Sequence, residues 1–116
     1  MIQTQDQTYT TLTESNFKSE TEEGFVVIDF WADWCGPCIA FAPVFESVAQ
    51  EMAGKLKFAK VNVDENPSIA TEFSVMSIPT IVLLKDGVEV TRKLGAMLNK
   101  DAFVDWLNSV IDENTQ

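Results

Sequence analysis

The two cysteines of this 116-residue chain lie only two residues apart, in the segment 31–38, which reads WADWCGPC. The residues just before it, 24–30, are apolar and rich in β-branched side chains, the pattern of a strand buried on both faces. Residues 39–45 follow with the composition of a helix. A cysteine pair at the turn between a buried strand and a helix is typical of a redox-active dithiol. We therefore expect an α/β fold organised around this turn.

Two other roles for the cysteine pair fit the sequence less well. A structural zinc site needs about four Cys or His ligands, whereas the chain has two Cys and no His, so a zinc ion would have to bridge two chains. A purely structural disulfide would close so short a loop that it removes little conformational entropy from the unfolded chain. A reactive dithiol without a bound metal is the favoured interpretation.

The order of the cysteines along the expected helix predicts their roles. Cys35 lies at the helix N-terminus, where unpaired N–H groups and the helix dipole stabilise the thiolate that attacks a disulfide. Cys38 lies one turn deeper on the same face. Gly36 leaves room for a substrate backbone, and Pro37 fixes φ where no helical hydrogen bond is lost. We expect Cys35 to be the nucleophile and Cys38 the more buried, resolving thiol.

Asp29 is a carboxylic acid in the middle of the apolar strand 25–31. An ionised carboxylate is costly to bury, so burial should raise the pKa of Asp29, and Lys60 on the neighbouring strand should oppose that rise. A carboxyl group that titrates near neutral pH behind Cys38 can accept the proton of that thiol. A solvated position on an edge strand and a structural ion pair with Lys60 are the alternatives.

The rest of the chain alternates between strand and helix patterns. Strands are predicted at 9–12, 25–31, 57–63, 81–84 and 88–94. Three helices should end near residues 21, 52 and 73, and a fourth should follow Asn99. Thr13, Asn66 and Asn99 are typical N-caps, Pro67 suits the first helical position, and Pro43 should bend the helix after the cysteines. This βαβαβαββα order implies a mixed five-stranded sheet with helices on both faces.

Length and charge limit the function further. A chain of 116 residues fits one domain, 1–116, in which residues 1–8 should be frayed. The formal net charge of -10 repels phosphate backbones and anionic lipid, which argues against nucleic-acid and membrane partners. Residues 1–16 lack the basic and apolar regions of an export signal. We therefore expect a cytoplasmic monomer whose thiols are kept reduced.

Taken together, these motifs resemble those of the thioredoxin family, from about residue 9 to residue 111. Segment 31–38 is similar to the active-site segment of that family. Further positions match its buried carboxylate, the lysine beside it, the helix kink, the cis-proline segment and two glycine positions: Asp29, Lys60, Pro43, 78–80, Gly87 and 95–96. Three positions depart from the usual pattern. Ile39 follows the second cysteine where Lys or Arg is common, and 76–77, Met and Ser, is less usual before the proline.

The resemblance implies a thioredoxin-like fold and a protein-disulfide reductase that carries electrons in cell redox homeostasis. In that reaction Cys35 attacks a substrate disulfide, Cys38 displaces the substrate, and Asp29, tuned by Lys60, accepts a proton. Thioredoxin reductase, which uses FAD and NADPH, would then restore the dithiol, with no cofactor bound to the chain itself. The resemblance also implies a cis bond before Pro79 and an exposed apolar docking surface made of Trp34, Gly36, Pro37, Ile78, Pro79, Gly95 and Ala96.

Two other functions remain to be compared with disulfide reduction. A binding subunit could use the same fold and apolar surface without catalysis, although it would not need Cys35, Cys38, Asp29 and Pro79 together. An exported oxidant or isomerase is disfavoured because Gly and Pro, and no His, separate the cysteines.

Overall fold

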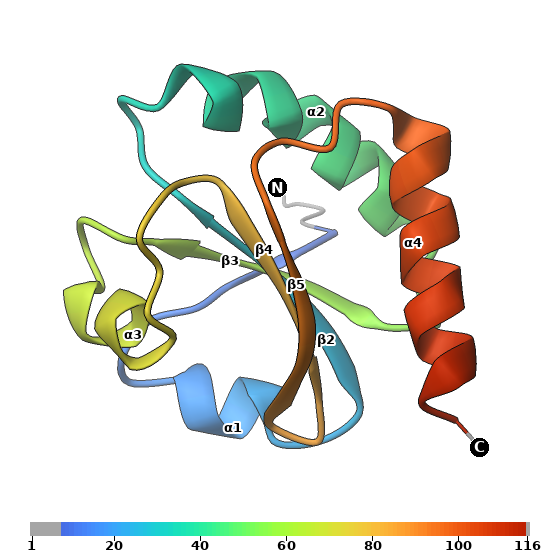
Figure 1. The fold of residues 1–116 in the computed structure, drawn as a ribbon. Coiled ribbons are helices and arrows are strands. Elements are labelled where there is room, and N and C mark those ends of the chain that lie inside the picture. The colour runs from blue at the N-terminus through green and yellow to red at the C-terminus, as the bar shows by residue number, and fades with distance from the viewer. Residues whose placement is uncertain (1–7, 116) are drawn as a thin grey trace, which may run out of the picture.

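A mixed sheet of five strands forms the centre of the computed structural model, which describes residues 8–115 (Figure 1). The strands are β1 (Thr10–Thr11), β2 (Phe25–Trp31), β3 (Lys57–Asn62), β4 (Thr80–Lys85) and β5 (Val88–Leu94). They lie in the order β1-β3-β2-β4-β5. β1, β3 and β2 are parallel, whereas β4 is antiparallel to β2 and β5 to β4. The predicted mixed sheet is confirmed, and β2 is its central strand.

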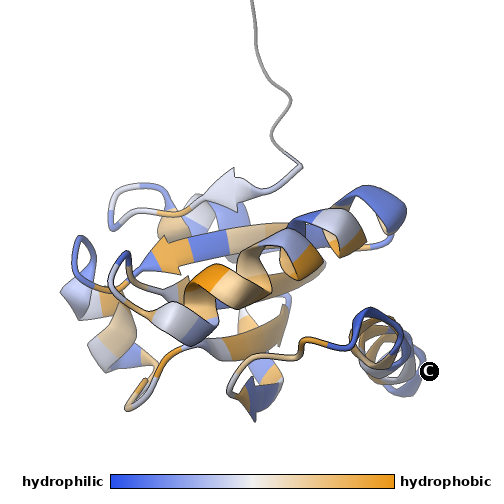
Figure 2. Cartoon of the chain, turned by 90° about the horizontal axis from the view of Figure 1, so that it is seen from above, coloured by the Kyte–Doolittle hydropathy of each residue, from blue (hydrophilic) through white to orange (hydrophobic). Residues whose placement is uncertain are grey.

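Helices cover both faces of this sheet. They are α1 (Phe17–Thr21), α2 (Gly36–Glu51), α3 (Pro67–Glu72) and α4 (Lys100–Glu113). One core cluster packs α2 and α4 against one face, with Phe41, Phe45 and Phe103 among its fully buried side chains. A second cluster packs α1 and α3 against the other face through Phe17 and Ile69. Figure 2 shows both hydrophobic and hydrophilic segments in the strands, and the apolar residues are concentrated in β2 and β4.

β2 positions the chemistry because it is buried on both faces and ends just before the cysteines. Its central residues 26–30 are all buried, as a strand with neighbours on both sides and helices on both faces requires. Side chains alternate along a strand, so Asp29 points to the same face as Val27, which packs in the cluster with α2. Asp29 is in register with Lys60 on β3 and with Ile81 on β4. The carboxyl group therefore lies on the α2 side of the sheet.

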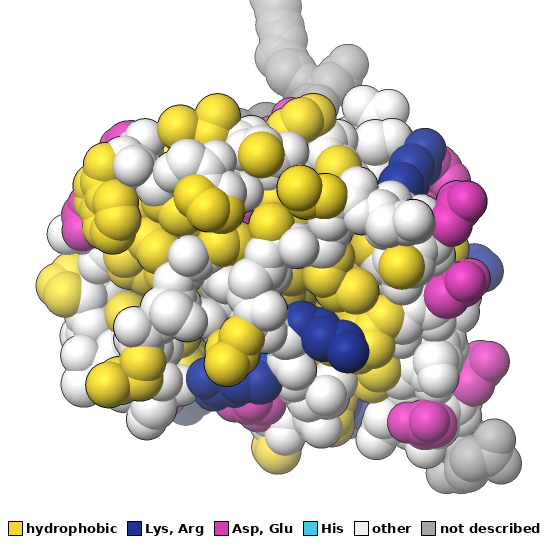
Figure 3. All heavy atoms as spheres, turned by 45° about the horizontal axis from the view of Figure 1, so that its top comes forward, with side chains coloured by type: hydrophobic (Ala, Val, Ile, Leu, Met, Phe, Trp, Pro, Cys, Tyr) yellow, Lys and Arg dark blue, Asp and Glu magenta, His cyan; other side chains and the backbone are white. Residues whose placement is uncertain are grey.

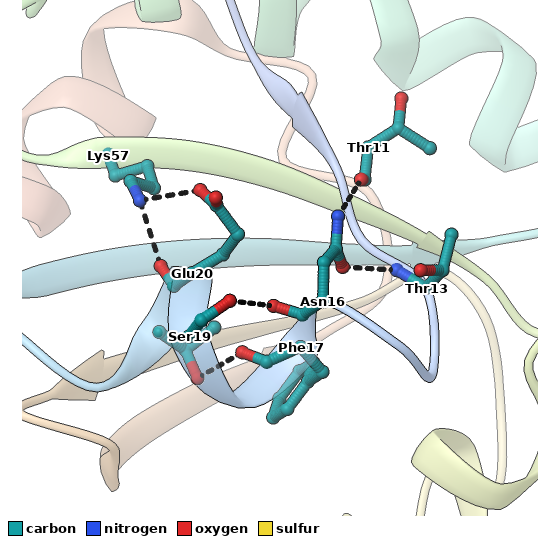
Figure 4. A network of polar contacts seen from close by, with 8 residues as sticks. Thr11, Thr13, Asn16, Phe17, Ser19, Glu20 and Lys57 are labelled. Carbon is teal, nitrogen blue, oxygen red and sulfur yellow. Dashed lines mark hydrogen bonds and ion pairs between the residues drawn. The ribbon is translucent and has the colours of Figure 1, made fainter.

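The first helix begins later than predicted. It starts at Phe17, and Asn16, not Thr13, is the residue that precedes it. The Asn16 side chain instead holds the preceding loop: its Oδ1 accepts from Thr13 N at 2.7 Å and its Nδ2 donates to Thr11 O at 3.1 Å (Figure 4). The other end of α1 is tied to the sheet by Lys57, whose Nζ lies 2.9 Å from Glu20 Oε1. The prediction that Thr13 caps this helix is therefore wrong.

Most other predicted bounds agree with the structure to within one or two residues. α2 ends at Glu51, and α3 begins at Pro67 and ends at Glu72. Asn99 caps α4, because its Oδ1 accepts from Ala102 N at 2.9 Å. Asn66 precedes α3 but makes no cap with its side chain. The turn between β4 and β5 has positive φ at both Asp86 (51°) and Gly87 (85°), which the predicted Asp-Gly hairpin turn requires.

Part of the predicted frayed terminus, residues 1–7, lies outside the described residues. Within residues 8–115, every helix is too short or too polar to cross a membrane.

Candidate active site

The two cysteines form a disulfide at the start of α2. β2 ends at Trp31, and the chain turns so that Cys35 N donates to Ala32 O at 3.2 Å before the helix begins at Gly36. Cys35 is the N-cap residue of α2, and its disulfide to Cys38 joins Cα atoms 5.2 Å apart. The predicted strand, turn and helix therefore bring the two sulfurs within bonding distance.

The helix N-terminus stabilises negative charge on the first sulfur. Cys35 Sγ accepts a hydrogen bond from Cys38 N at 3.2 Å, which is the bond that an N-cap side chain makes. The first turn of α2 carries no acidic residue that would oppose this effect. After reduction, the same N–H group and the helix dipole favour a Cys35 thiolate.

The two cysteines differ in their surroundings more than in their burial. Cys35 is 4% exposed and Cys38 is 2% exposed, so the predicted difference in burial is small. Cys35 Sγ lies 3.7 Å from Ile78 O, at the edge of the molecule where Gly36 and Pro37 are exposed. Cys38 instead lines a cavity of about 270 Å³ on the inner side of α2. Cys35 therefore lies beside the exposed residues Gly36 and Pro37, whereas Cys38 lies beside Asp29.

Asp29 shares that inner cavity with Cys38. The carboxyl group is 1% exposed, and its Oδ1 has no hydrogen-bond partner among the described residues. Burial raises the pKa of Asp29 from 3.8 to about 7, the ammonium of Lys60 lowers it, and the carboxylate of Glu46 raises it. The expected direction of the shift and the opposing effect of Lys60 are confirmed. The alternative of a solvated carboxylate on an edge strand is wrong.

Lys60 does not make its ion pair with Asp29. Its Nζ lies 3.1 Å from Oε2 of Glu46 on α2, although Lys60 is in register with Asp29 in the sheet. Sequence reasoning missed Glu46. Its spacing could have indicated it, because Cys38, Ala42 and Glu46 recur every four residues along one face of α2, and all three line the cavity.

Comparison with known proteins shows the family to which this chain belongs. A family model described as Thioredoxin matches residues 8–109. The chain belongs to the thioredoxin family. It is 53% identical over 96 residues to the thioredoxin of Bacillus subtilis, covering 83% of this chain and 91% of that protein. It is 43% identical over 102 residues to the thioredoxin of Rickettsia felis, covering 86% and 96%. As a thioredoxin-family chain with a paired Cys35 and Cys38, it is a protein-disulfide oxidoreductase.

The residues predicted to form an exposed apolar docking surface are only partly exposed. Figure 3 shows hydrophobic side chains gathered on the face of the molecule where α2 begins. Trp34, Gly36 and Pro37 are exposed, and Ile78, Gly95 and Ala96 are half-buried. Pro79 is buried, and its carbonyl accepts from Gly95 N at 2.8 Å, so the 95–96 loop is held against it. The prediction that Pro79 is part of the exposed surface is therefore wrong.

The bond between Ile78 and Pro79 is cis, as the resemblance implied. Neither backbone group of Ile78 pairs with another backbone group within the described part of the chain. The carbonyl oxygen of Ile78 lies 3.7 Å from Cys35 Sγ, so this segment runs beside the first cysteine.

A shallow apolar groove of about 340 Å³ adjoins Trp34 and Ile78, two of the residues predicted to bind substrate. It is lined by Trp34, Val63, Ala70, Val75, Met76, Ser77 and Ile78. Met76 is 92% exposed at its rim. A hydrogen bond holds the Trp34 indole in place, because its Nε1 donates to Asp64 Oδ2 at 2.8 Å. Asp64 was not predicted, since it lies thirty residues from Trp34 in the sequence.

Proposed function

We propose that the chain is a general thioredoxin-type reductant that transfers two electrons from its Cys35–Cys38 dithiol to disulfides in extended protein segments. The observation that carries this proposal is the pairing of the two cysteines at the N-terminus of α2, with the buried Asp29 in the cavity behind Cys38. We further propose that it acts as a cytoplasmic monomer and as one domain over residues 1–116.

The first step is attack on the substrate. The Cys35 thiolate attacks one sulfur of the substrate disulfide, so that a mixed disulfide forms and the other substrate sulfur leaves as a thiolate and takes a proton from water. The exposed Gly36 and Pro37 leave the outer side of Cys35 open to an approaching backbone. The Ile78 backbone groups, which have no backbone partner among the described residues, and the apolar groove beside Trp34 hold the peptide during this attack.

The second step is resolution of the mixed disulfide. The Cys38 thiol gives its proton to the carboxylate of Asp29, directly or through water in their shared cavity. The resulting thiolate attacks the Cys35 sulfur, re-forms the Cys35–Cys38 bond and expels the second substrate thiolate. A carboxyl group with a pKa of about 7 is matched to this task, because it is ionised in part at neutral pH and still basic enough to accept the proton.

Regeneration requires an external two-electron donor. We propose that this donor is a thioredoxin reductase, in which NADPH supplies a hydride through FAD and a reductase dithiol reduces the Cys35–Cys38 bond by exchange. One NADPH and one proton are consumed for each disulfide that is reduced.

Reduction of insulin tests the proposal. Addition of the protein and dithiothreitol should speed the appearance of turbidity, as the insulin chains separate, and Cys35→Ser should abolish that acceleration. Pre-reduced Cys38→Ser, mixed with insulin without dithiothreitol, should instead accumulate a mixed disulfide, because the resolving thiol is missing. A wild-type protein that gives no acceleration would refute the reductase and favour the binding subunit.

The role of Asp29 is tested separately. Asp29→Asn should slow resolution of the mixed disulfide at neutral pH and leave substrate docking unchanged. A rate equal to that of the wild type would remove Asp29 from the mechanism.

A further inference from the structure

Lys60 is a nearly buried cation that lies near two carboxyl groups, those of Asp29 and Glu46. It is 7% exposed, and it lines the same cavity as Asp29 and Glu46. Its Nζ lies 3.1 Å from Glu46 Oε2, while Oδ1 of Asp29 has no partner among the described residues. The Lys60 ammonium therefore pairs with Glu46 on α2 and not with Asp29, its neighbour in the sheet.

Aromatic rings hold the ammonium in this position. Lys60 Nζ lies 4.7 Å from the ring centre of Tyr9, and 5.7 Å from the rings of both Trp31 and Phe45. A cation at these distances is attracted to the face of an aromatic ring. These rings limit the movement of the Lys60 ammonium. Within that limited range, the ion pair with Glu46 holds the ammonium toward α2 and away from Asp29.

We propose that Glu46 is a positioning residue for thiol–disulfide exchange, because its ion pair with Lys60 keeps that ammonium from pairing with Asp29 and leaves Asp29 free to accept the proton of Cys38. This inference rests on the proposed function of Asp29 as proton acceptor. It assigns to Glu46 a role that acts through two other side chains.

The physical effect follows from the charges around Asp29. The titratable groups that share its cavity are Tyr9, Cys38, Glu46 and Lys60, and β4 contributes the apolar Ile81 next to it. Among these, Lys60 lowers the pKa of Asp29 and Glu46 raises it. Without the Glu46 carboxylate, Lys60 can pair with Asp29, which would then remain ionised to lower pH and be a weaker base.

Glu46→Gln tests this role, and Glu51→Gln is a matched control. Both residues belong to α2, both pair with a lysine, and their side chains are 43% and 49% exposed. The partner of Glu51 is Lys100, which does not line the cavity. Glutamine keeps the size of each side chain at a half-exposed helical position, so both variants should fold.

The primary measurement is the NMR titration of the Asp29 carboxyl carbon in the reduced protein, which needs no substrate. Glu46→Gln should lower the titration midpoint by roughly one pH unit, because an opposite charge moves closer to Asp29. Glu51→Gln should leave the midpoint unchanged. The second measurement is the rate at which the preformed mixed disulfide is resolved, followed as a function of pH.

In that rate profile Glu46→Gln should shift the acidic limb to lower pH and reduce the plateau by roughly two- to fivefold, since a weaker base accepts the proton less readily. When Asp29 is already replaced by Asn, Glu46→Gln should not change the rate of resolution any further. An unchanged Asp29 midpoint in Glu46→Gln, or an equal shift in Glu51→Gln, would overturn the role of Glu46 alone. Resolution by Asp29→Asn at the wild-type rate would overturn the proton-acceptor role and the inference together.

Discussion

Replacement of Asp29 by Asn should change how the stability of the protein depends on pH. Burial raises the pKa of the Asp29 carboxyl from 3.8 to about 7 in the folded chain. Between these two values the folded chain holds a proton that the unfolded chain has released, so protonation favours folding. This contribution is fully present below the unfolded pKa and is lost as the pH rises through the folded pKa. Asp29→Asn cannot ionise and lacks this dependence.

The magnitude follows from the two pKa values. Each pH unit between them corresponds to about 1.4 kcal/mol, so the full contribution of Asp29 is about 4 kcal/mol. Between about pH 5 and about pH 8, the free energy of unfolding of the wild type should fall by about 2 to 3 kcal/mol relative to that of Asp29→Asn. Any constant cost of burying the Asn amide cancels, because only the change with pH is compared.

The assay is urea unfolding followed by tryptophan fluorescence, over this pH range, on the oxidised protein. The disulfide keeps the cysteines from titrating. Asp105→Asn is the control, since Asp105 is exposed on α4, and its difference from the wild type should stay flat with pH. A difference between wild type and Asp29→Asn that is equally flat would refute the argument that burial holds a proton on Asp29.

Three further substitutions test other parts of the structure. Phe45→Ala should lower the free energy of unfolding by about 3–5 kcal/mol, because the ring is fully buried among other aromatic rings; a loss below about 1 kcal/mol in urea unfolding would contradict this. Asp64→Ala removes the acceptor of the Trp34 indole N–H and should raise the KM for insulin by roughly two- to fivefold with kcat little changed; an unchanged KM would show that the bond does not prepare the docking surface. Ile39→Lys places a cation beside the active-site cavity and should increase the rate of Cys35 alkylation by iodoacetamide below neutral pH by roughly two- to fivefold. High salt should reduce that increase, and a rate that is the same as in the wild type would show that the cation does not reach the thiolate.

Much of the fold could be predicted because its signals are local. The apolar run at 25–31 has the same bounds as β2, and Asn99 caps α4 through a backbone group three residues away. The cysteine spacing and the helix that follows place Cys35 at an N-cap. Periodicity, capping and turn chemistry depend on residues within about one helical turn of each other, so a single sequence contains them.

The first helix shows where local signals fail. Thr13 and Asn16 are both suitable N-caps by residue type, so residue type alone does not choose between them. Asn16 bonds to the loop after β1, and Glu20 near the end of α1 bonds to Lys57, which is 37 residues away. The two Asn16 bonds are local, whereas the bond between Glu20 and Lys57 exists only once β3 lies beside α1.

The sequence by itself determined the dithiol, the strand before it and the presence of a carboxyl group among apolar neighbours. Only the tertiary structure decided that Lys60 pairs with Glu46, that Oδ1 of Asp29 is left without a partner, and that Pro79 is buried. The physical reason is that charge pairing and desolvation depend on distances between separate segments. Lys60 lies near both Asp29 and Glu46, and Asp29 shares a cavity with Cys38, only after β2, β3 and α2 have packed together.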